Sequence, residues 1–188
     1  MKRKLILFIA SLTVFMVLAS CGSEEEYQPE ELTDVDRCEV CNMAVPHDHN
    51  ATQIVLKDGK ALKFDDIGCL NEWITENGTD DVGAQFVRDY HTEEWINLEE
   101  ATFVYDKDFK TPMAYGIFSF KNADDAEKFL DEQGTGKLMT PDDLADHHWE
   151  RNMEMMKQMK EMMKDNEHNH DHSSENDDEE EHAENDEQ

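Results

Sequence analysis

The sequence predicts an α+β fold: two similar β-β-α-β units packed together, then a Met-rich helix and a disordered acidic tail. Three observations predict it. A fifteen-residue stretch occurs twice, strand-like segments flank both copies, and charged residues replace apolar ones toward the C-terminus. Antiparallel hairpins with helices on one face are typical of the α+β class.

The repeated stretch reads "FDDIGCLNEWITENG" from Phe64 to Gly78 and "FKNADDAEKFLDEQG" from Phe120 to Gly134. In each copy apolar residues recur at helical spacing behind an Asp or Asn that can cap the helix, and a glycine follows. We therefore expect one helix in each unit, at the same place in the repeat.

Strand-like segments flank each helix. "TQIVLKDGKALKF" predicts a hairpin that turns at Asp58 and Gly59, and "AQFVRDY" predicts a strand after the first helix. In the second unit, "ATFVYDKDFKTPMAYGIFSF" contains two apolar stretches with a polar connection, and "GKLMT" follows the helix. Each unit therefore reads as β-β-α-β.

The first residues form a leader. Lys2, Arg3 and Lys4 precede an apolar run that is too short for a typical membrane span and suits a signal peptide. The sequence "LASC", which ends at Cys21, resembles the lipobox of bacterial lipoproteins, in which this cysteine carries a lipid. We predict lipidation of Cys21 and a lipid-anchored protein on the extracytoplasmic face of the cell membrane. The alternative is an uncleaved N-terminal anchor helix.

The composition shifts divide the chain into five parts. The predicted segments are a signal peptide (1–20), a lipidated tether (21–36), a core (37–145) with repeat units at about 50–90 and 101–140, a Met-rich helix (146–165) and a disordered His- and acid-rich tail (166–188).

The charge excludes several functions. The chain has 46 Asp and Glu against 17 Lys and Arg, and three of those basic residues lie in the leader. Such a surface repels nucleic acid and anionic lipid heads, so we expect no nucleic-acid partner and membrane contact through the lipid alone. The sequence has no serine nucleophile motif and no phosphate or nucleotide loop, so we do not expect an enzyme.

The motif "CEVCNM" places Cys38, Cys41 and Met43 close together. A Cys-x-x-Cys pair is typical of a redox dithiol, half of a zinc site or a disulfide. The thioether of Met43 adds a fourth meaning, because copper(I) prefers thiolate and thioether ligands together. His47, His49 and Cys69 are further candidate ligands, and all four meanings stay open on the motif alone.

The Met-rich segment, residues 142 to 164, predicts one helix that opens at Thr140 or Pro141. Met156, Met159 and Met163 share a helical face, on which thioethers can converge on a soft ion. The alternative is a packing face in which methionine is adaptable filler.

The tail after this helix has no apolar residue beyond Ala183, so it is expected to be disordered. His168, His170 and His172 alternate with polar residues there, and we take them as a candidate collector of metal ions.

Several segments together resemble the NosL family, lipoprotein accessory factors encoded with nitrous oxide reductase. They are, in order, "CEVCNMAV", "FDDIGCLNEW", "VRDYHTEEWI", and "TPMAYGIFSF" with "DDAEKFLDEQG". The resemblance covers roughly residues 36 to 145. It implies a doubled β-β-α-β fold, copper(I) binding, and delivery of copper to the maturation machinery that assembles the reductase's copper centres.

Carried over by position, the family's Cys-x-x-Cys-x-Met motif falls on Cys38, Cys41 and Met43, and its threonine-proline-methionine segment falls on Met113. These four residues are the predicted copper ligands. Asp65, Asp66 and His91 are candidates for orienting the ligands, with a helix cap or a surface role as the alternative. Two other functions remain: a thiol–disulfide oxidoreductase, or a lipoprotein that sequesters copper or zinc.

Overall fold

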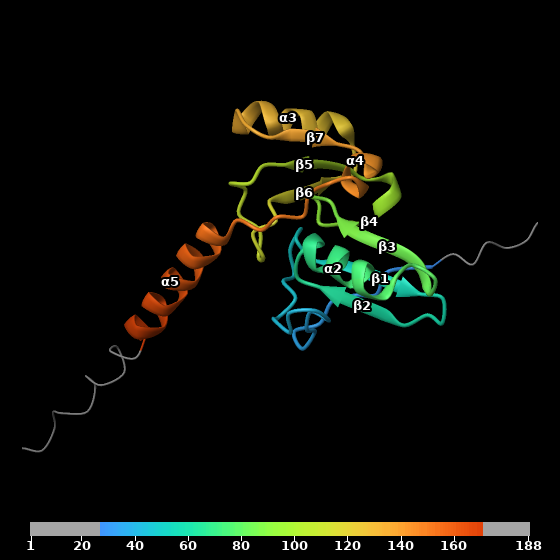
Figure 1. The fold of residues 1–188 in the computed structure, drawn as a ribbon, viewed down its shortest axis with the longest axis horizontal. Helices are drawn as coiled ribbons and strands as arrows, with labels where there is room; N and C mark the ends of the chain where they lie inside the picture. The colour runs from blue at the N-terminus through green and yellow to red at the C-terminus, as the bar shows by residue number, and fades with distance from the viewer. Residues whose placement is uncertain (1–26, 171–188) are drawn as a thin grey trace, which may run out of the picture.

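The computed structural model describes residues 27–170, with side chains up to residue 162. It has two antiparallel sheets and several helices, so the predicted α+β class is confirmed (Figure 1). Within the described part of the chain, every helix is too short or too polar to cross a membrane. The predicted signal peptide, Cys21 and most of the predicted tail lie outside the described residues.

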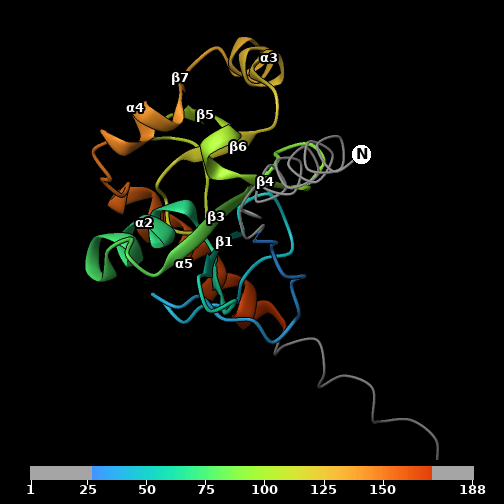
Figure 2. The same cartoon turned by 90° about the vertical axis from the view of Figure 1, so that its right-hand side faces the viewer.

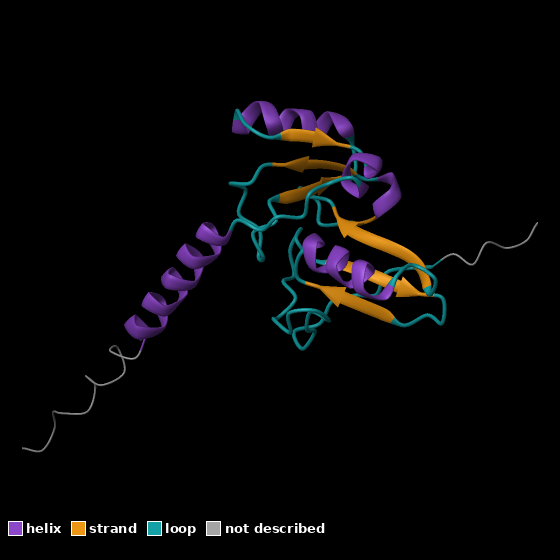
Figure 3. Cartoon of the chain, in the orientation of Figure 1, coloured by secondary structure: helices purple, strands orange, loops and turns teal. Residues whose placement is uncertain are grey.

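The first unit is a four-stranded sheet with one helix. Its strands have the order β2-β1-β3-β4, and α2 lies across one face (Figure 3). The predicted turn at Asp58 and Gly59 joins β1 to β2, and Gly59 has a φ of 88°. The elements are β1 (Thr52–Leu56), β2 (Ala61–Phe64), α2 (Ile67–Asn77), β3 (Val82–Arg88) and the short edge strand β4 (Trp95–Asn97), which the sequence did not predict.

The second unit has three strands and one helix, and a 3₁₀ turn (Leu98–Glu100) leads into it. The strand order is β6-β5-β7, and α3 packs against all three strands. The elements are β5 (Thr102–Tyr105), β6 (Ile117–Phe120), α3 (Ala123–Gln133) and β7 (Lys137–Met139).

The sequence repeat coincides with the structural repeat over one strand and one helix. The offset that aligns Phe64 with Phe120 also aligns β2 with β6 and α2 with α3 at both ends. The offset fails before these strands. Residues 57–60 join β1 to β2, whereas the longer segment 106–116 joins β5 to β6.

The two units are joined where β3 ends beside β6 (Figure 2). The Tyr90 N–H donates to the Ser119 carbonyl over 2.8 Å, and the Ser119 hydroxyl donates to the Arg88 carbonyl over 2.7 Å. The Asp89 carboxylate accepts from the Lys121 N–H over 2.8 Å. An apolar cluster with members from both units, including Val87 and Phe103, continues this junction into the interior.

The predicted Met-rich helix is present as α5 (Met153–His170), but the prediction that one helix runs on from Thr140 or Pro141 is wrong. Thr140 caps α4 (Pro141–Ala145) through a capping box, but α4 ends at Asp146 and α5 is a separate helix. Between them, Trp149 packs on Tyr115 with 6.1 Å between ring centres, and other residues of the segment hydrogen-bond to the 106–116 loop. These tertiary contacts outweigh the local helix propensity.

Candidate metal centre

Three cysteines and one aspartate converge at one place in the first unit. Cys38, Cys41, Asp65 and Cys69 each offer one ligand atom, and these atoms all lie within 4.8 Å of one another. Among the residues that the structure describes, no other group of His, Cys, Asp and Glu meets this condition. Cys38, Cys41 and Cys69 are free thiols, so no disulfide joins them.

Cys38 and Cys41 lie on a tight turn before β1. The Cys38 N–H donates to the Met43 carbonyl and the Asn42 N–H donates to the Cys38 carbonyl, each over 2.9 Å. Asn42 has a φ of 60°, in the left-handed region that asparagine tolerates better than most residues. A hydrogen bond from the Glu39 N–H to the Lys63 carbonyl, 3.1 Å long, ties the turn to β2.

Asp65 and Cys69 come from the start of α2. Asp66 caps this helix by accepting from the Gly68 N–H over 2.9 Å, so Asp65 lies just before the cap and Cys69 in the first turn. A Cβ at Gly68 would lie 2.0 Å from the ring of Tyr115. The glycine therefore lets the helix approach the 106–116 loop closely, and the cap reading of Asp66 is correct.

The Asp65 carboxylate is only partly satisfied. It is 1% exposed, and its Oδ2 accepts from the Cys41 thiol over 3.1 Å. Its Oδ1 is buried without a hydrogen-bond partner, and burial raises the pKa of Asp65 to about 6. Leaving a buried acceptor unpaired costs about 1–3 kcal/mol. A cation at this place would relieve that cost.

The pKa values of the three thiols are shifted in different directions. A hydrogen bond from Cys69 lowers the pKa of Cys38, and the same hydrogen bond raises the pKa of Cys69. Burial raises the pKa of Cys41. The hydrogen bond from Cys69 thus favours ionisation of Cys38 over ionisation of Cys69, and a soft cation would displace the protons that the thiols carry.

Met113 and Met43 differ in how deeply they are buried near these thiols. Met113 is buried and belongs to the same apolar cluster as Cys38 and Cys69. Its backbone N–H donates to Asp66 Oδ2 over 2.9 Å, which fixes the loop against the start of α2. Met43 is 46% exposed and lies two positions after Cys41 in the sequence.

Of the residues predicted as ligands, the structure thus brings Cys38 and Cys41 together and places Met113 in their cluster. Cys69 and Asp65 join them, although the sequence marked Cys69 only as a further candidate and Asp65 only as an orienting group. The repeat contained a signal that was missed. The second unit has Lys121 and Asp125 where the first has Asp65 and Cys69, so the repeated fold does not require Asp65 and Cys69, and a separate role for them could have been inferred.

The histidines near the cysteine motif lie elsewhere. His47 faces the carboxylate of Asp34 at 3.7 Å, with its side chain half exposed. His49 packs against the rings of Tyr90 and Phe118, with ring centres 4.5 and 5.2 Å away. A zinc knuckle completed by either histidine is therefore absent from the described residues.

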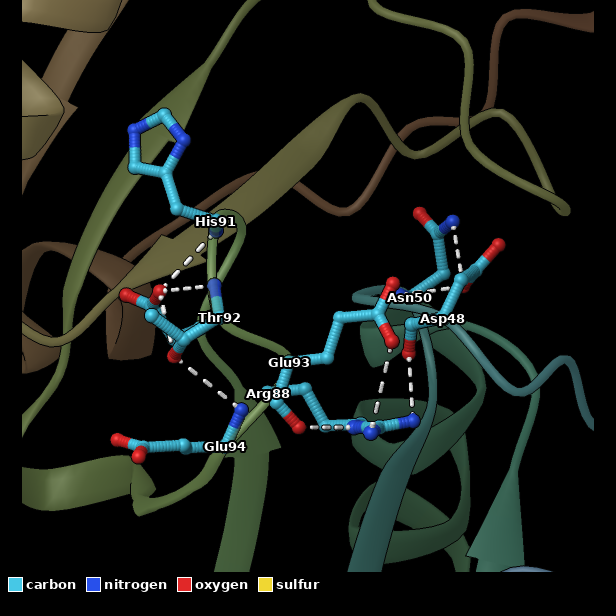
Figure 4. A network of polar contacts seen from close by, with 8 residues as sticks. Asp48, Asn50, Arg88, His91, Thr92, Glu93 and Glu94 are labelled. Atoms are coloured by element: carbon cyan, nitrogen blue, oxygen red, sulfur yellow. Dashed lines mark hydrogen bonds and ion pairs between the residues drawn. The ribbon is translucent and has the colours of Figure 1, made fainter.

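His91 also lies outside the group. Figure 4 shows its ring directed away from the network in which Arg88 links Asp48 to Glu93. The ring packs against Tyr90, with a further ring contact to Phe120 at 5.6 Å. Its place is at the junction of the units, so we assign it no part in orienting the thiols.

The C-terminal candidates are placed only in part. Met156 is partly buried and packs against the apolar cluster that contains Cys38 and Met113. Met159 lies in α5 and is half-buried. Met163, His168 and His170 belong to α5 beyond the described side chains, and His172 lies outside the described residues.

Comparison with known proteins gives one family. No curated protein matches the sequence. Among solved structures, the crystal structure of the copper chaperone NosL from Shewanella denitrificans is similar, with a TM-score of 0.54 and 21% identity over 61% of this chain and 93% of that chain. This similarity shows a shared fold. The NosL family model matches residues 29–149, most of the chain, and the chain belongs to the NosL family.

Proposed function

We propose that this protein is a membrane-anchored, extracytoplasmic copper(I)-binding chaperone that delivers copper for the assembly of nitrous oxide reductase. The observation that carries the proposal is the convergence of Cys38, Cys41, Asp65 and Cys69 within 4.8 Å. Family membership and the copper chaperone named in the similar crystal structure support it.

The donor set favours a soft, univalent ion. Three thiols, and the thioether of Met113 in the same apolar cluster, offer sulfur, which copper(I) prefers over oxygen or water. We assign Cys38, Cys41 and Cys69 as the strong ligands and Met113 as a weaker thioether ligand that can exchange. Asp65 contributes negative charge beside them and accepts from Cys41.

Among the four residues of the candidate metal centre, Cys41 is the one that is not fully buried, and such partial access suits transfer. Met43 is exposed and follows Cys41, itself half-buried, on the same turn. We assign Met43 as the ligand that meets an incoming partner. A soft ligand of the partner attacks the ion there, forms a shared intermediate and draws the ion away as the inner thiols are released. The predicted lipid on Cys21 would keep this exchange at the membrane surface.

Two other functions each rest on a specific observation. Three cysteines and one carboxylate are also a donor set that zinc accepts, which favours a zinc-sequestering protein. The lowered pKa of Cys38 in a Cys-x-x-Cys motif favours a thiol–disulfide oxidoreductase. However, a redox dithiol of that type lies at a helix N-terminus, whereas Cys38 and Cys41 lie on a turn.

Anaerobic titration of the full chain with copper(I) against a competing chelator tests the proposal. We expect one tightly bound ion, its loss in Cys41→Ser, and copper–sulfur scattering in the X-ray absorption spectrum. Met162→Leu, at an exposed position of α5, is the control and should bind like the natural chain. Tighter binding of zinc than copper(I), or disulfide turnover that ignores Met113→Leu, would contradict the proposal.

A further inference from the structure

The segment before α5 fastens the Met-rich helix to the loop that carries Met113. The Asn152 N–H donates to the Ala114 carbonyl, and its side-chain amide donates to the Lys107 carbonyl, each over 2.9 Å. Arg151 Nε donates to the Met113 carbonyl over 3.0 Å. The first turn of α5 is therefore held beside the metal centre, while the rest of the helix projects away from the two units (Figure 1).

Arg151 lies between two thioethers. Its Nη2 is 3.8 Å from the Met113 sulfur and 3.8 Å from the Met156 sulfur, so the two sulfurs are separated by no more than twice that distance. The guanidinium carbon also lies 5.6 Å from the centre of the Tyr115 ring. Two sulfurs and an aromatic face thus surround one positive charge.

The surroundings of Arg151 are unusual for this chain. The formal net charge is −29, yet none of the carboxylates in the described region forms an ion pair with Arg151. Thioether sulfur is a weak acceptor, and the aromatic face adds a modest cation–π attraction. The place therefore stabilises a positive charge mainly through soft groups, and one hydrogen bond, from Arg151 Nε to the Met113 carbonyl, has to break before the guanidinium can leave.

We propose that Met113 and Met156 form a second copper(I) site, which Arg151 fills in the metal-free protein and through which the ion passes to and from the thiols. This inference rests on the proposed copper(I) function. It adds a residue of α5 and a second route to the centre formed by Cys38, Cys41 and Cys69, beside the route past Met43 by which a partner protein draws the ion away.

The exchange at this second site is balanced. Copper(I) binds the two sulfurs as the guanidinium swings out, so one univalent cation replaces another. Thioethers have no proton to lose, and no electron moves. Two thioethers hold the ion less tightly than a site with thiolates, so the ion moves inward when the thiols are free. The softness of the sulfurs discriminates against zinc and other harder ions.

The helix offers the next step outward. Met159 lies one turn after Met156 on the same face, and both are half-buried, whereas Met153 and Met162 are 66% and 54% exposed. Side chains three positions apart on a helix are neighbours. The half-buried methionines therefore extend the route, and the exposed ones provide matched controls.

Methyl NMR tests the site directly. The full-length chain, purified from membranes in detergent and labelled with ¹³C-methyl methionine, is titrated with copper(I) without oxygen. We expect the first equivalent to move the Met113 signal and the second to move Met113 and Met156 together, while Met162 stays unchanged. Met156→Leu should keep the first binding event and lose the second, with Met162→Leu behaving like the natural chain.

Two further measurements separate a copper route from a merely structural contact. Transfer of copper(I) from Met156→Leu to an excess chelator should slow about tenfold, as expected when the exchange barrier rises by roughly 1.4 kcal/mol. Arg151→Gln should strengthen binding of the second equivalent, because no cation then has to leave. The indole N–H signal of Trp149 in the NMR spectrum reports whether the segment is still docked in each variant.

The outcomes distinguish the two proposals. The second site is wrong, and the chaperone proposal stands, if Met156→Leu binds and releases copper(I) like the natural chain. In that case the Met156 methyl signal of the natural chain should also stay unchanged during the titration. Weaker second binding in Arg151→Gln would also overturn the assignment, because the arginine would then be a support rather than an occupant. If the natural chain fails to bind the first equivalent, the proposed function itself is wrong.

Discussion

The two β-β-α-β units share the positions that make the fold and differ at the positions that make the metal centre. Phe64 and its counterpart Phe120 are both fully buried at the end of the second strand. The next positions diverge: where the first unit has Asp65, Asp66 and Cys69, the second has Lys121, Asn122 and Asp125. Both units therefore keep the residues that form the fold, whereas only the first unit has the candidate metal ligands.

The second unit contributes to the site in another way. Its connection between the first two strands, residues 106–116, is longer than the tight turn of the first unit and carries Met113 to the start of α2. The backbone is shaped for this task, because Gly116 has a φ of 68° and a Cβ there would lie 2.1 Å from the Asp106 carbonyl oxygen. One unit supplies the thiols, and the other supplies a thioether through its loop.

The largest expected effect comes from making the first unit like the second at a ligand position. Cys69→Asp copies Asp125 into the metal centre and removes a thiol. Copper(I) affinity should fall by more than the roughly 10–100-fold that loss of a supporting group costs. The reverse change, Asp125→Cys, is the matched control and should add no second tight ion. Titration against a chelator measures both, and unchanged affinity in Cys69→Asp would remove Cys69 from the ligand set.

The next largest expected effect is a loss of unfolding free energy, and it tests how closely α2 and α3 each pack against neighbouring side chains. Gly68→Ala places a methyl group against the Tyr115 ring, and such overpacking lowers the free energy of unfolding by about 1–3 kcal/mol. Its counterpart in the repeat is Asp124, which is exposed in the first turn of α3.

The control for this change is Asp124→Ala. It removes only a helix-terminus interaction of about 0.3–1 kcal/mol. Urea denaturation of both variants gives the comparison. Equal losses would mean that the close contact between α2 and Tyr115 does not distinguish the units.

The sequence reveals the repeated scaffold because that information is local. Helical spacing, an Asp or Asn at the start and a glycine at the end mark α2 and α3 without tertiary knowledge. The edge strand Trp95–Asn97 was missed because acidic residues, which are depleted in strands, lie close on both sides of it. The break between α4 and α5 was missed because it depends on Trp149 packing against Tyr115, a contact between residues far apart in the chain.

Of the candidate metal centre, only the residues that are close together in the sequence could be predicted as a group. Cys38 and Cys41 are neighbours in sequence, so their pairing could be predicted. The addition of Asp65 and Cys69 depends on the hydrogen bond that ties Glu39 to Lys63, a contact between distant segments that no local pattern reveals. The same holds for Arg151, whose place between two methionines follows from the path of the segment before α5.

A third prediction tests the junction that holds the units in register. Burial alone would raise the pKa of Asp89, but hydrogen bonds from Lys121, Thr92 and His91 outweigh it and lower the pKa. Asp89→Ala leaves these donors unpaired and should cost about 2 kcal/mol of unfolding free energy, within the range for hydrogen bonds to charged groups. Asp89→Asn keeps an acceptor and should lose less.

The pH dependence of this junction has a definite sign. The folded protein holds the Asp89 carboxylate below the ordinary pKa of 3.8, so the unfolded chain binds more protons in that range. The stability from Asp89 is fully present above that value and is lost as the pH falls through the folded pKa. Denaturation curves between neutral and strongly acidic pH should therefore fall less steeply for Asp89→Ala. Parallel curves would show that another carboxylate controls acid unfolding.

The smallest expected change in unfolding free energy distinguishes the two loops that carry the proposed sulfur ligands. Asn42 and Ala114 both have left-handed backbone, with φ of 60° and 58°. Ala114 is buried and its carbonyl is held by Asn152, so tertiary contacts enforce its conformation. Asn42 is exposed, and its turn depends more on the residue itself. Asn42→Ala should therefore lower the unfolding free energy by about 1 kcal/mol, the cost of a side chain in this region, while Asn42→Gly should change it by only a few tenths. If Asn42→Ala is neutral by urea denaturation, the backbone hydrogen bonds of Cys38 with Met43 and with residue 42 hold the turn without help, and the thiol loop is as rigidly supported as the loop that carries Met113.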